Sequence, residues 1–108
     1  MSQVTTHVLD AALGTPARGV GVVLSRADGD VVASGATDDA GRIADLGPAR
    51  LPAGTYRLAF ATGAYFAGTG RETFYPAVSI EFAVADPDQH YHVPLLISPF
   101  SYSTYRGN

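Results

Sequence analysis

Short apolar segments, each ended by Gly, Pro or Asp, are the feature of this chain that most restricts its fold. Segments of this length suit strands, because an amphipathic helix needs ten or more residues of apolar periodicity. Residues 78–84, VSIEFAV, alternate most cleanly, with the four larger apolar side chains on one face. Such alternation predicts a strand with one face buried against a core.

Similar segments recur along the chain and predict an all-β fold. Further strands are expected at residues 4–9, 19–26, 31–37, 55–61, 90–98 and 101–106. Turns are expected at residues 14–17, 28–30 (a hairpin signal), 38–42 and 85–88, a loop or edge at 47–54, and one short helix near 63–70. Strands about 8–12 residues apart with almost no helix indicate an antiparallel β-sandwich.

Length and charge limit the domain organisation and the class of partner. A chain of 108 residues suits one domain, spanning 1–108. Its net charge of −3 argues against nucleic acid or an anionic membrane as the main partner, since both attract basic surfaces. No apolar run is long enough to span a membrane. The first residues lack a basic region followed by an apolar run, so we expect no signal peptide and a cytoplasmic location.

The residue types that are missing exclude several chemistries. Cysteine is absent, which excludes disulfides, a thiol nucleophile and a thiolate metal site. Lysine is also absent, so any functional cation is an arginine or a histidine. There is no Gly-x-Ser-x-Gly segment and no glycine-rich phosphate loop, which argues against serine catalysis and nucleotide binding.

Histidines are the first candidates for chemistry. In a strand, His90 and His92 point to one face and Tyr91 to the other. This arrangement fits a proton-transfer site or a metal site, and it equally fits two solvated surface histidines. With His7, which lies in another expected strand, the three imidazoles suffice for a zinc site with an open position. No carboxylate stands at a spacing that completes the zinc pattern, so zinc is not favoured.

Two arginines are further candidates. Arg42 follows the turn at residues 38–42 and is either a solvated side chain or a planar donor fork for an oxygen-rich ligand. Chain ends are usually poorly ordered. The β-rich composition of residues 101–105, however, predicts that the tail is held as a strand, with Arg106 fixed beside the terminal carboxylate. Residue chemistry alone names no reaction.

Three sequence motifs give information about the family that composition alone does not. They are His-Val-Leu-Asp followed by Gly-x-Pro-Ala, Asp-x-x-Gly-Arg, and His-x-His-x-Pro-Leu-Leu with Tyr-Arg-Gly near the end. Together, from Thr5 to Gly107, they resemble the transthyretin-like family and, more closely, its enzyme branch, the 5-hydroxyisourate hydrolases. The carrier branch would have lysine at His7 and an apolar tail in place of Tyr105-Arg106-Gly107. The enzyme branch usually ends in serine, where this chain has Asn108, which keeps a hydrogen-bonding side chain and lacks the hydroxyl.

The resemblance implies a fold, an assembly and a reaction. The fold is a sandwich of two four-stranded antiparallel sheets with one short helix. The assembly is a homotetramer, a dimer of dimers, with sites in a channel where the dimers meet. The reaction is hydrolysis of 5-hydroxyisourate to 2-oxo-4-hydroxy-4-carboxy-5-ureidoimidazoline, without a metal or organic cofactor. The implied catalytic residues are His7, Arg42, His92 and Arg106, with His90, Tyr105, Gly107 and Asn108 at the substrate.

Three alternatives remain open from the sequence. The first is a non-catalytic carrier of a small aromatic ligand in the same fold. The second is a zinc hydrolase that uses His7, His90 and His92. The third is an interaction sandwich without a site, which leaves the clustered motifs unexplained.

Overall fold

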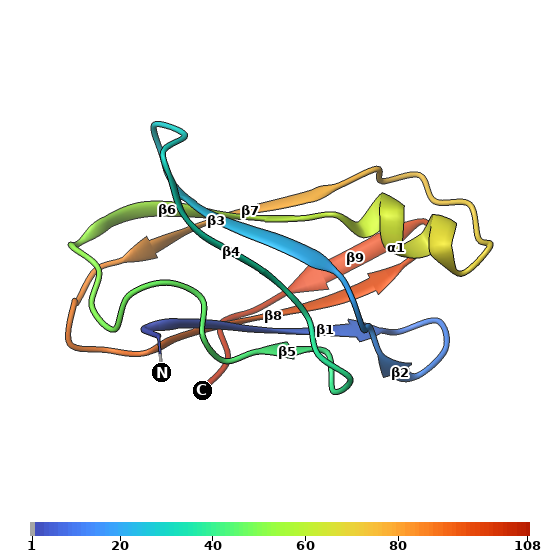
Figure 1. Cartoon of the computed structure of the whole chain (residues 1–108), viewed down its shortest axis with the longest axis horizontal. Helices are drawn as coiled ribbons and strands as arrows, with labels where there is room; N and C mark the ends of the chain where they lie inside the picture. Colours follow the sequence, from blue (N-terminus) through green and yellow to red (C-terminus); the bar gives the residue numbers. More distant parts are fainter. Residues whose placement is uncertain (1) are drawn as a thin grey trace.

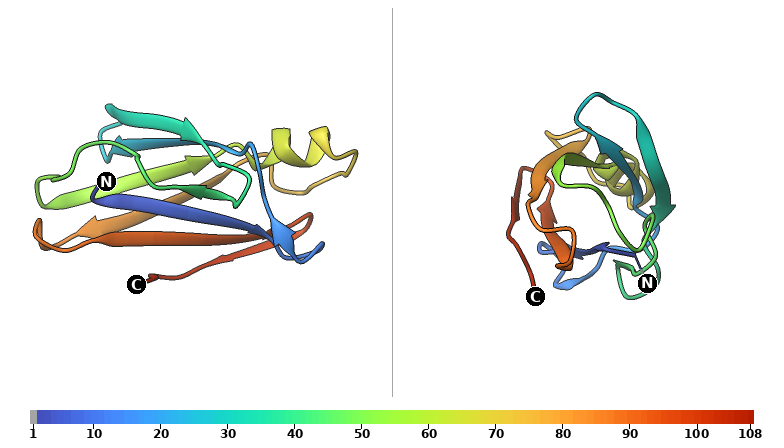
Figure 2. Two further views of the ribbon diagram at one scale, coloured as in Figure 1. Left: turned by 60° about the horizontal axis from the view of Figure 1, so that its bottom comes forward. Right: turned by 90° about the vertical axis from the view of Figure 1, so that its left-hand side faces the viewer.

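The computed structural model describes residues 2–108 as two β-sheets packed face to face (Figures 1 and 2). One sheet has the strand order β4-β3-β6-β7, and the other has the order β2-β1-β8-β9 with β5 paired to β1. The strands are β1 Val4–Asp10, β2 Thr15–Pro16, β3 Gly21–Arg26, β4 Val31–Ala36, β5 Arg42–Ile43, β6 Gly54–Phe60, β7 Val78–Val84, β8 Tyr91–Ser98 and β9 Ser101–Thr104, and the helix α1 is Thr62–Gly68. The predicted sandwich with one short helix is confirmed.

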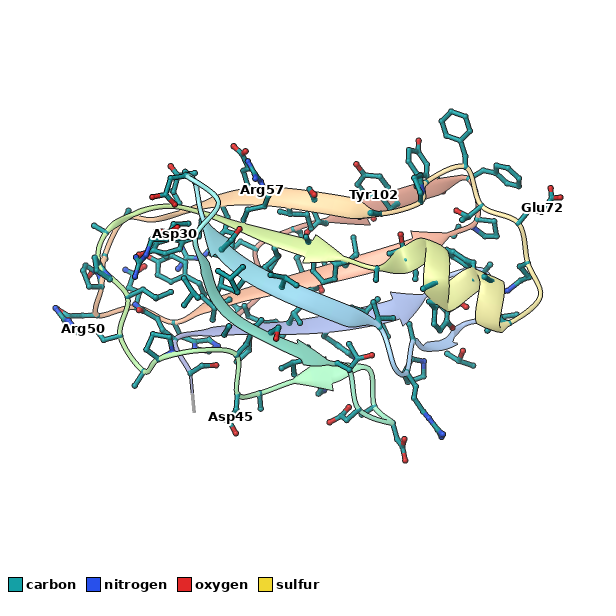
Figure 3. All side chains as sticks on the ribbon, turned by 45° about the horizontal axis from the view of Figure 1, so that its top comes forward. Asp30, Asp45, Arg50, Arg57, Glu72 and Tyr102 are labelled. Atoms are coloured by element: carbon teal, nitrogen blue, oxygen red, sulfur yellow. The ribbon has the colours of Figure 1, made fainter. Side chains whose placement is uncertain are left out.

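Alternating side chains from both sheets fill the space between the layers (Figure 3). In β1, Val4 and Val8 are fully buried, and in β8 Leu95 and Ile97 are buried in the same core. The expected alternation of β7 is also present, because its four larger apolar side chains are buried or half-buried and the three positions between them are exposed. One face of each strand therefore forms the core, and the other face is left for a site or an interface.

The predicted hairpin at residues 28–30 joins β3 to β4. Gly29 has φ of +99°, a conformation that favours glycine, and its amide donates to the carbonyl of Arg26 over 2.9 Å. The amide of Arg26 in turn donates to the carbonyl of Asp30. The hairpin therefore forms where the sequence predicts it, through the conformation of a glycine within the turn.

One strand pairing differs from the antiparallel expectation. β1 and β8 run parallel, in register from Val4 beside Tyr91 to Asp10 beside Ile97, whereas the other strand pairs are antiparallel. Between β1 and β8 the chain forms β2 and β5 on the same sheet and all four strands of the other sheet, so a long crossover permits parallel pairing. This pairing places β1 and β8 side by side, although paired residues such as Val4 and Tyr91 are 87 positions apart in the sequence.

The sequence missed two short strands and placed the helix correctly. β2 and β5, each two residues long, pair with the same edge of β1. β2 lies within the turn expected at 14–17, and β5 begins at the last residue of the turn expected at 38–42. The helix falls within the expected residues 63–70 to within a residue at its start, and Phe66 anchors it in the core. In the part of the chain that the structure describes, no helix is long and apolar enough to cross a membrane.

Candidate active site

The candidate site lies on the outer face of the sheet that contains β1 and β8. Because Val4, Thr6 and Val8 of β1 point into the core, Thr5 and His7 point outward. In β8 the same alternation buries Tyr91 and Val93 and turns His92 outward. The parallel register sets Thr5 beside His92, so groups from the two ends of the chain meet on one face.

Arg42 reaches this face through a tightly bonded turn. Its amide donates to a carboxylate oxygen of Asp38 over 2.8 Å, and the amide of Ala40 donates to the same oxygen over 2.9 Å. Gly41 has φ of +75°, and a Cβ there would lie 2.4 Å from the carbonyl oxygen of Val8. A glycine is therefore required for β5 to approach β1 and to place Arg42 directly opposite His7.

The tautomer of His7 follows from its partner. Nε2 of His7 lies 2.9 Å from the carbonyl oxygen of Ala40. A carbonyl only accepts hydrogen bonds, so Nε2 of His7 carries the proton and donates it. In the neutral ring, Nδ1 of His7 then holds the lone pair.

His90 and His92 meet at the hydroxyl of Thr5. Oγ1 of Thr5 lies 2.9 Å from Nε2 of His90 and 2.8 Å from Nδ1 of His92. His90 immediately precedes β8, although the sequence placed it within that strand. The prediction that the two imidazoles share a face is confirmed by this common contact.

A cavity of about 210 Å³ opens at this cluster. It is lined by Thr5, Thr6, Arg42, Ile43, Ala44, His90, His92 and Asn108. None of these described lining residues has an acidic side chain. The polar wall thus combines imidazole, hydroxyl, amide and guanidinium groups, a set that suits an oxygen-rich ligand.

The surroundings of His92 favour its neutral form. Burial lowers the pKa of His92 below its usual value of 6.5, and the positive charge of Arg42 lowers it further, as do His7 and His90. A neutral imidazole at neutral pH is what a general base requires.

The C-terminal tail is held against His92, as its sequence predicts. β9 ends at Thr104, and Gly107 then forms an isolated bridge with His92, donating its amide to the His92 carbonyl over 2.9 Å. A Cβ on Gly107 would lie only 2.6 Å from Cδ2 of His92. The absence of a side chain at Gly107 is therefore what lets the tail pack against the imidazole.

Arg106 and Tyr105 do not line the first cavity. The guanidinium of Arg106 stacks over Tyr91 at 4.6 Å from the ring centre and donates to Oε1 of Gln89 over 3.1 Å. Tyr105 and Arg106 line a second cavity of about 300 Å³, between β7 and the β8–β9 pair. His92 lines both cavities, so it is the residue that connects the tail with the histidine cluster.

Sequence reasoning missed Thr5, Asp38 and Gly41. Thr5 stands two residues before His7 in an expected strand, and this spacing already put both side chains on one face. Asp38 and Gly41 were included in a turn and in the Asp-x-x-Gly-Arg motif but were given no role at the site, because their effect on Arg42 depends on the contact of β5 with β1.

The described residues of the site form no cluster of metal ligands. Among residues 2–108, no group of three His, Asp or Glu side chains is arranged to hold a metal ion. The histidines that were candidates for zinc contact the Thr5 hydroxyl and the Ala40 carbonyl instead.

Comparison with known proteins identifies the family. The profile described as "Transthyretin: HIUase/Transthyretin family" matches residues 4–107. The chain belongs to this family. Within the HIUase/Transthyretin family, a 5-hydroxyisourate hydrolase of Caulobacter vibrioides is 49% identical, and the alignment covers all of both chains.

Solved structures of the HIUase/Transthyretin family agree with this assignment. The 5-hydroxyisourate hydrolase of Klebsiella pneumoniae superposes with a TM-score of 0.91 at 47% identity, covering 100% of this chain and 94% of that chain. The transthyretin of Sparus aurata has the same TM-score at 36% identity, with 99% and 97% coverage. The fold is common to both branches, and the sequences place this chain in the enzyme branch, as expected from His7 and the Tyr-Arg-Gly segment.

Proposed function

We propose that this protein hydrolyses 5-hydroxyisourate to 2-oxo-4-hydroxy-4-carboxy-5-ureidoimidazoline. The observation that carries the proposal is the convergence of His7, Arg42 and His92 on one sheet face through the β1–β5 and β1–β8 pairings. The substrate is a small fused ring with several carbonyls. The reaction opens its six-membered ring at the N1–C6 amide.

The three catalytic tasks match groups at the site. Water must lose a proton, and a neutral imidazole of His92 or His7 accepts it. The tetrahedral oxyanion needs donors, and the guanidinium of Arg42 supplies two on one planar fork. The leaving nitrogen then takes its proton from the imidazolium formed in the first step. No step requires a metal or organic cofactor.

Arg106 is proposed to act from the tail, together with Tyr105, Gly107 and Asn108. In one chain Arg106 faces Tyr91 and Gln89. We propose that assembly into a homotetramer brings this tail and the outer face of β1 and β8 into one channel, where the sites are completed. A cytoplasmic location remains a prediction from the sequence.

A direct assay tests the activity. Urate oxidase generates 5-hydroxyisourate from urate, and its ultraviolet absorbance decays spontaneously. Added protein is expected to accelerate that decay in proportion to its concentration. An unchanged decay would contradict the proposed function and favour the carrier reading, which the equal structural likeness to the Sparus aurata transthyretin supports.

A further inference from the structure

The hydroxyl of Thr5 bridges the two imidazoles of the candidate site. Its Oγ1 is 2.8 Å from Nδ1 of His92 and 2.9 Å from Nε2 of His90. Thr5 is only 7% exposed, and the β1–β8 register fixes it beside His92. A threonine in a strand also has a restricted χ1 angle, so the hydroxyl stays between the rings.

A hydroxyl has one proton and two lone pairs. If both rings donated to Thr5, the hydroxyl proton would have no acceptor among residues 2–108, so Thr5 donates to one ring nitrogen and accepts from the other. In the first arrangement, Nδ1 of His92 donates to Thr5 and Thr5 donates to Nε2 of His90. In the second arrangement, Nε2 of His90 donates to Thr5 and Thr5 donates to Nδ1 of His92. The tautomers of the two rings are therefore coupled through a single hydroxyl.

Only the first arrangement suits His92 as a general base. The neutral ring then has its lone pair on Nε2, which has no hydrogen-bond partner among residues 2–108. When Nε2 takes a proton from water, Nδ1 continues to donate to Thr5, so no group has to reorient. In the second arrangement Nε2 of His92 already carries a proton and accepts no other.

We propose that Thr5 is a positioning residue through which His90 selects the tautomer of His92. His92 is then a base only while Nε2 of His90 is unprotonated. The inference rests on the proposed function for its effect on rate, but the coupling itself is a property of the resting protein.

The proposal predicts a specific response to acid. When His90 gains a proton, its Nε2 must donate to Thr5, and the hydroxyl turns toward Nδ1 of His92. The other charged groups that act on His92 are Arg42 and His7. His7 takes no part in the relay, because the carbonyl of Ala40 holds its Nε2 proton.

Two substitutions of Thr5 separate the hydroxyl from the shape of the side chain. Thr5→Val keeps the branched shape and loses the hydroxyl, whereas Thr5→Ser keeps the hydroxyl. We expect kcat/KM for 5-hydroxyisourate to fall about tenfold or more in Thr5→Val, because a general base contributes on the order of 10²–10⁴ in rate. Thr5→Ser should stay within about threefold of wild type. Thr62→Val, which alters a buried threonine at the start of α1, is the matched control.

Nitrogen NMR of the 15N-histidine-labelled protein measures the tautomers without substrate. At a pH where the rings are neutral, wild type and Thr5→Ser should show His92 as the Nδ1–H tautomer, and Thr5→Val should show a mixture. In wild type, the Nε2 signal of His92 should also change at the midpoint at which His90 titrates. This titration uses wild-type protein alone, so the proposal can be tested even if Thr5→Val fails to fold.

The outcomes are distinct for the two proposals. A His92 tautomer that is identical in wild type and Thr5→Val, or a His92 signal that ignores the titration of His90, would overturn the coupling. Wild-type protein that leaves the decay of 5-hydroxyisourate unchanged would instead overturn the proposed function, whatever the NMR spectra show.

Discussion

The backbone of Gly107 lies against the imidazole of His92, so closely that a Cβ would come within 2.6 Å of Cδ2. The His92 carbonyl accepts the amide proton of Gly107 over 2.9 Å, which fixes the tail to β8. The last residues of the chain therefore form one wall of the candidate site.

Gly107→Ala is expected to displace the His92 ring and to lower kcat/KM by about tenfold or more, since misplacement of a base by about 1 Å can cost roughly 10²-fold. Steady-state kinetics on 5-hydroxyisourate measures this. Gly68→Ala is the matched control, because nothing lies within 4 Å of a Cβ at that helix position. Equal activity of both variants would contradict a role for the tail contact.

Arg42 is expected to set the pH dependence of the reaction as well as to bind the substrate. Burial and the charge of Arg42 lower the pKa of His92, so its neutral, active form persists below pH 6.5 and is lost as the pH falls through the lowered pKa. Arg42→Gln should therefore move the acidic limb of kcat/KM to higher pH.

Arg42→Lys separates charge from shape. We expect it to keep the position of the acidic limb and still to lower kcat/KM about tenfold or more, because the planar donor fork is lost. A pH–rate profile of each variant is the measurement. Unaltered kcat/KM in Arg42→Lys would count against the proposed role of the planar guanidinium group.

Asp10 is expected to stabilise the fold far from the site. Its side chain is fully buried and accepts hydrogen bonds from Arg71 over 2.6 Å, from Tyr65 over 2.8 Å and from the amide of Leu13 over 3.0 Å. Burial raises the pKa of Asp10, but the hydrogen bonds from Arg71, Tyr65 and Leu13 outweigh it, so the pKa lies below 3.8. The stabilisation of the fold by ionised Asp10 is therefore fully present above the usual pKa of 3.8 and is lost as the pH falls through the lowered pKa.

Asp10→Asn should lower the free energy of unfolding at pH 7 by about 3 kcal/mol, because it breaks a largely buried ion pair. Glu81→Gln breaks the more exposed pair with Arg57 and should cost less than about 1 kcal/mol. Urea denaturation of both variants gives the comparison. Similar losses in the two would refute the assignment of Asp10 as a structural anchor.

Deletion of residues 105–108 is expected to reduce activity by about 10²-fold or more while the sandwich stays folded, because the charged and amide groups of the tail are removed from the site. Light scattering establishes whether the truncated protein keeps the oligomeric state of the full chain. A truncated protein of the same assembly and normal activity would show that the tail is only structural.

The sequence predicted most strands because their causes are local. The alternation in β7 and the Asp-Gly-Asp hairpin each depend on neighbouring residues, and both are present. β2 and β5 depend instead on pairing with β1, which no local pattern records. The parallel contact of β1 with β8 is likewise set by the path of the whole chain.

The sequence named several residues of the candidate site but did not give their geometry. His7, Arg42 and His92 were named from the sequence, and the structure brings them to one face. The orientation of Arg106 over Tyr91 was not foreseen, because it arises from packing at the end of β8. Thr5 was overlooked because threonine is common in strands, and its contacts with the imidazoles of His90 and His92 are visible only in the structure.

The central claim is tested most directly by the rate at which 5-hydroxyisourate decays in the presence of a strong chelator. The rate is measured with wild-type protein and with His92→Asn. The account predicts rapid decay with wild type and a kcat/KM lowered on the order of 10²-fold or more in His92→Asn, with the fold retained by circular dichroism. Wild-type kinetics in the folded variant, or activity that disappears with the chelator, would contradict it.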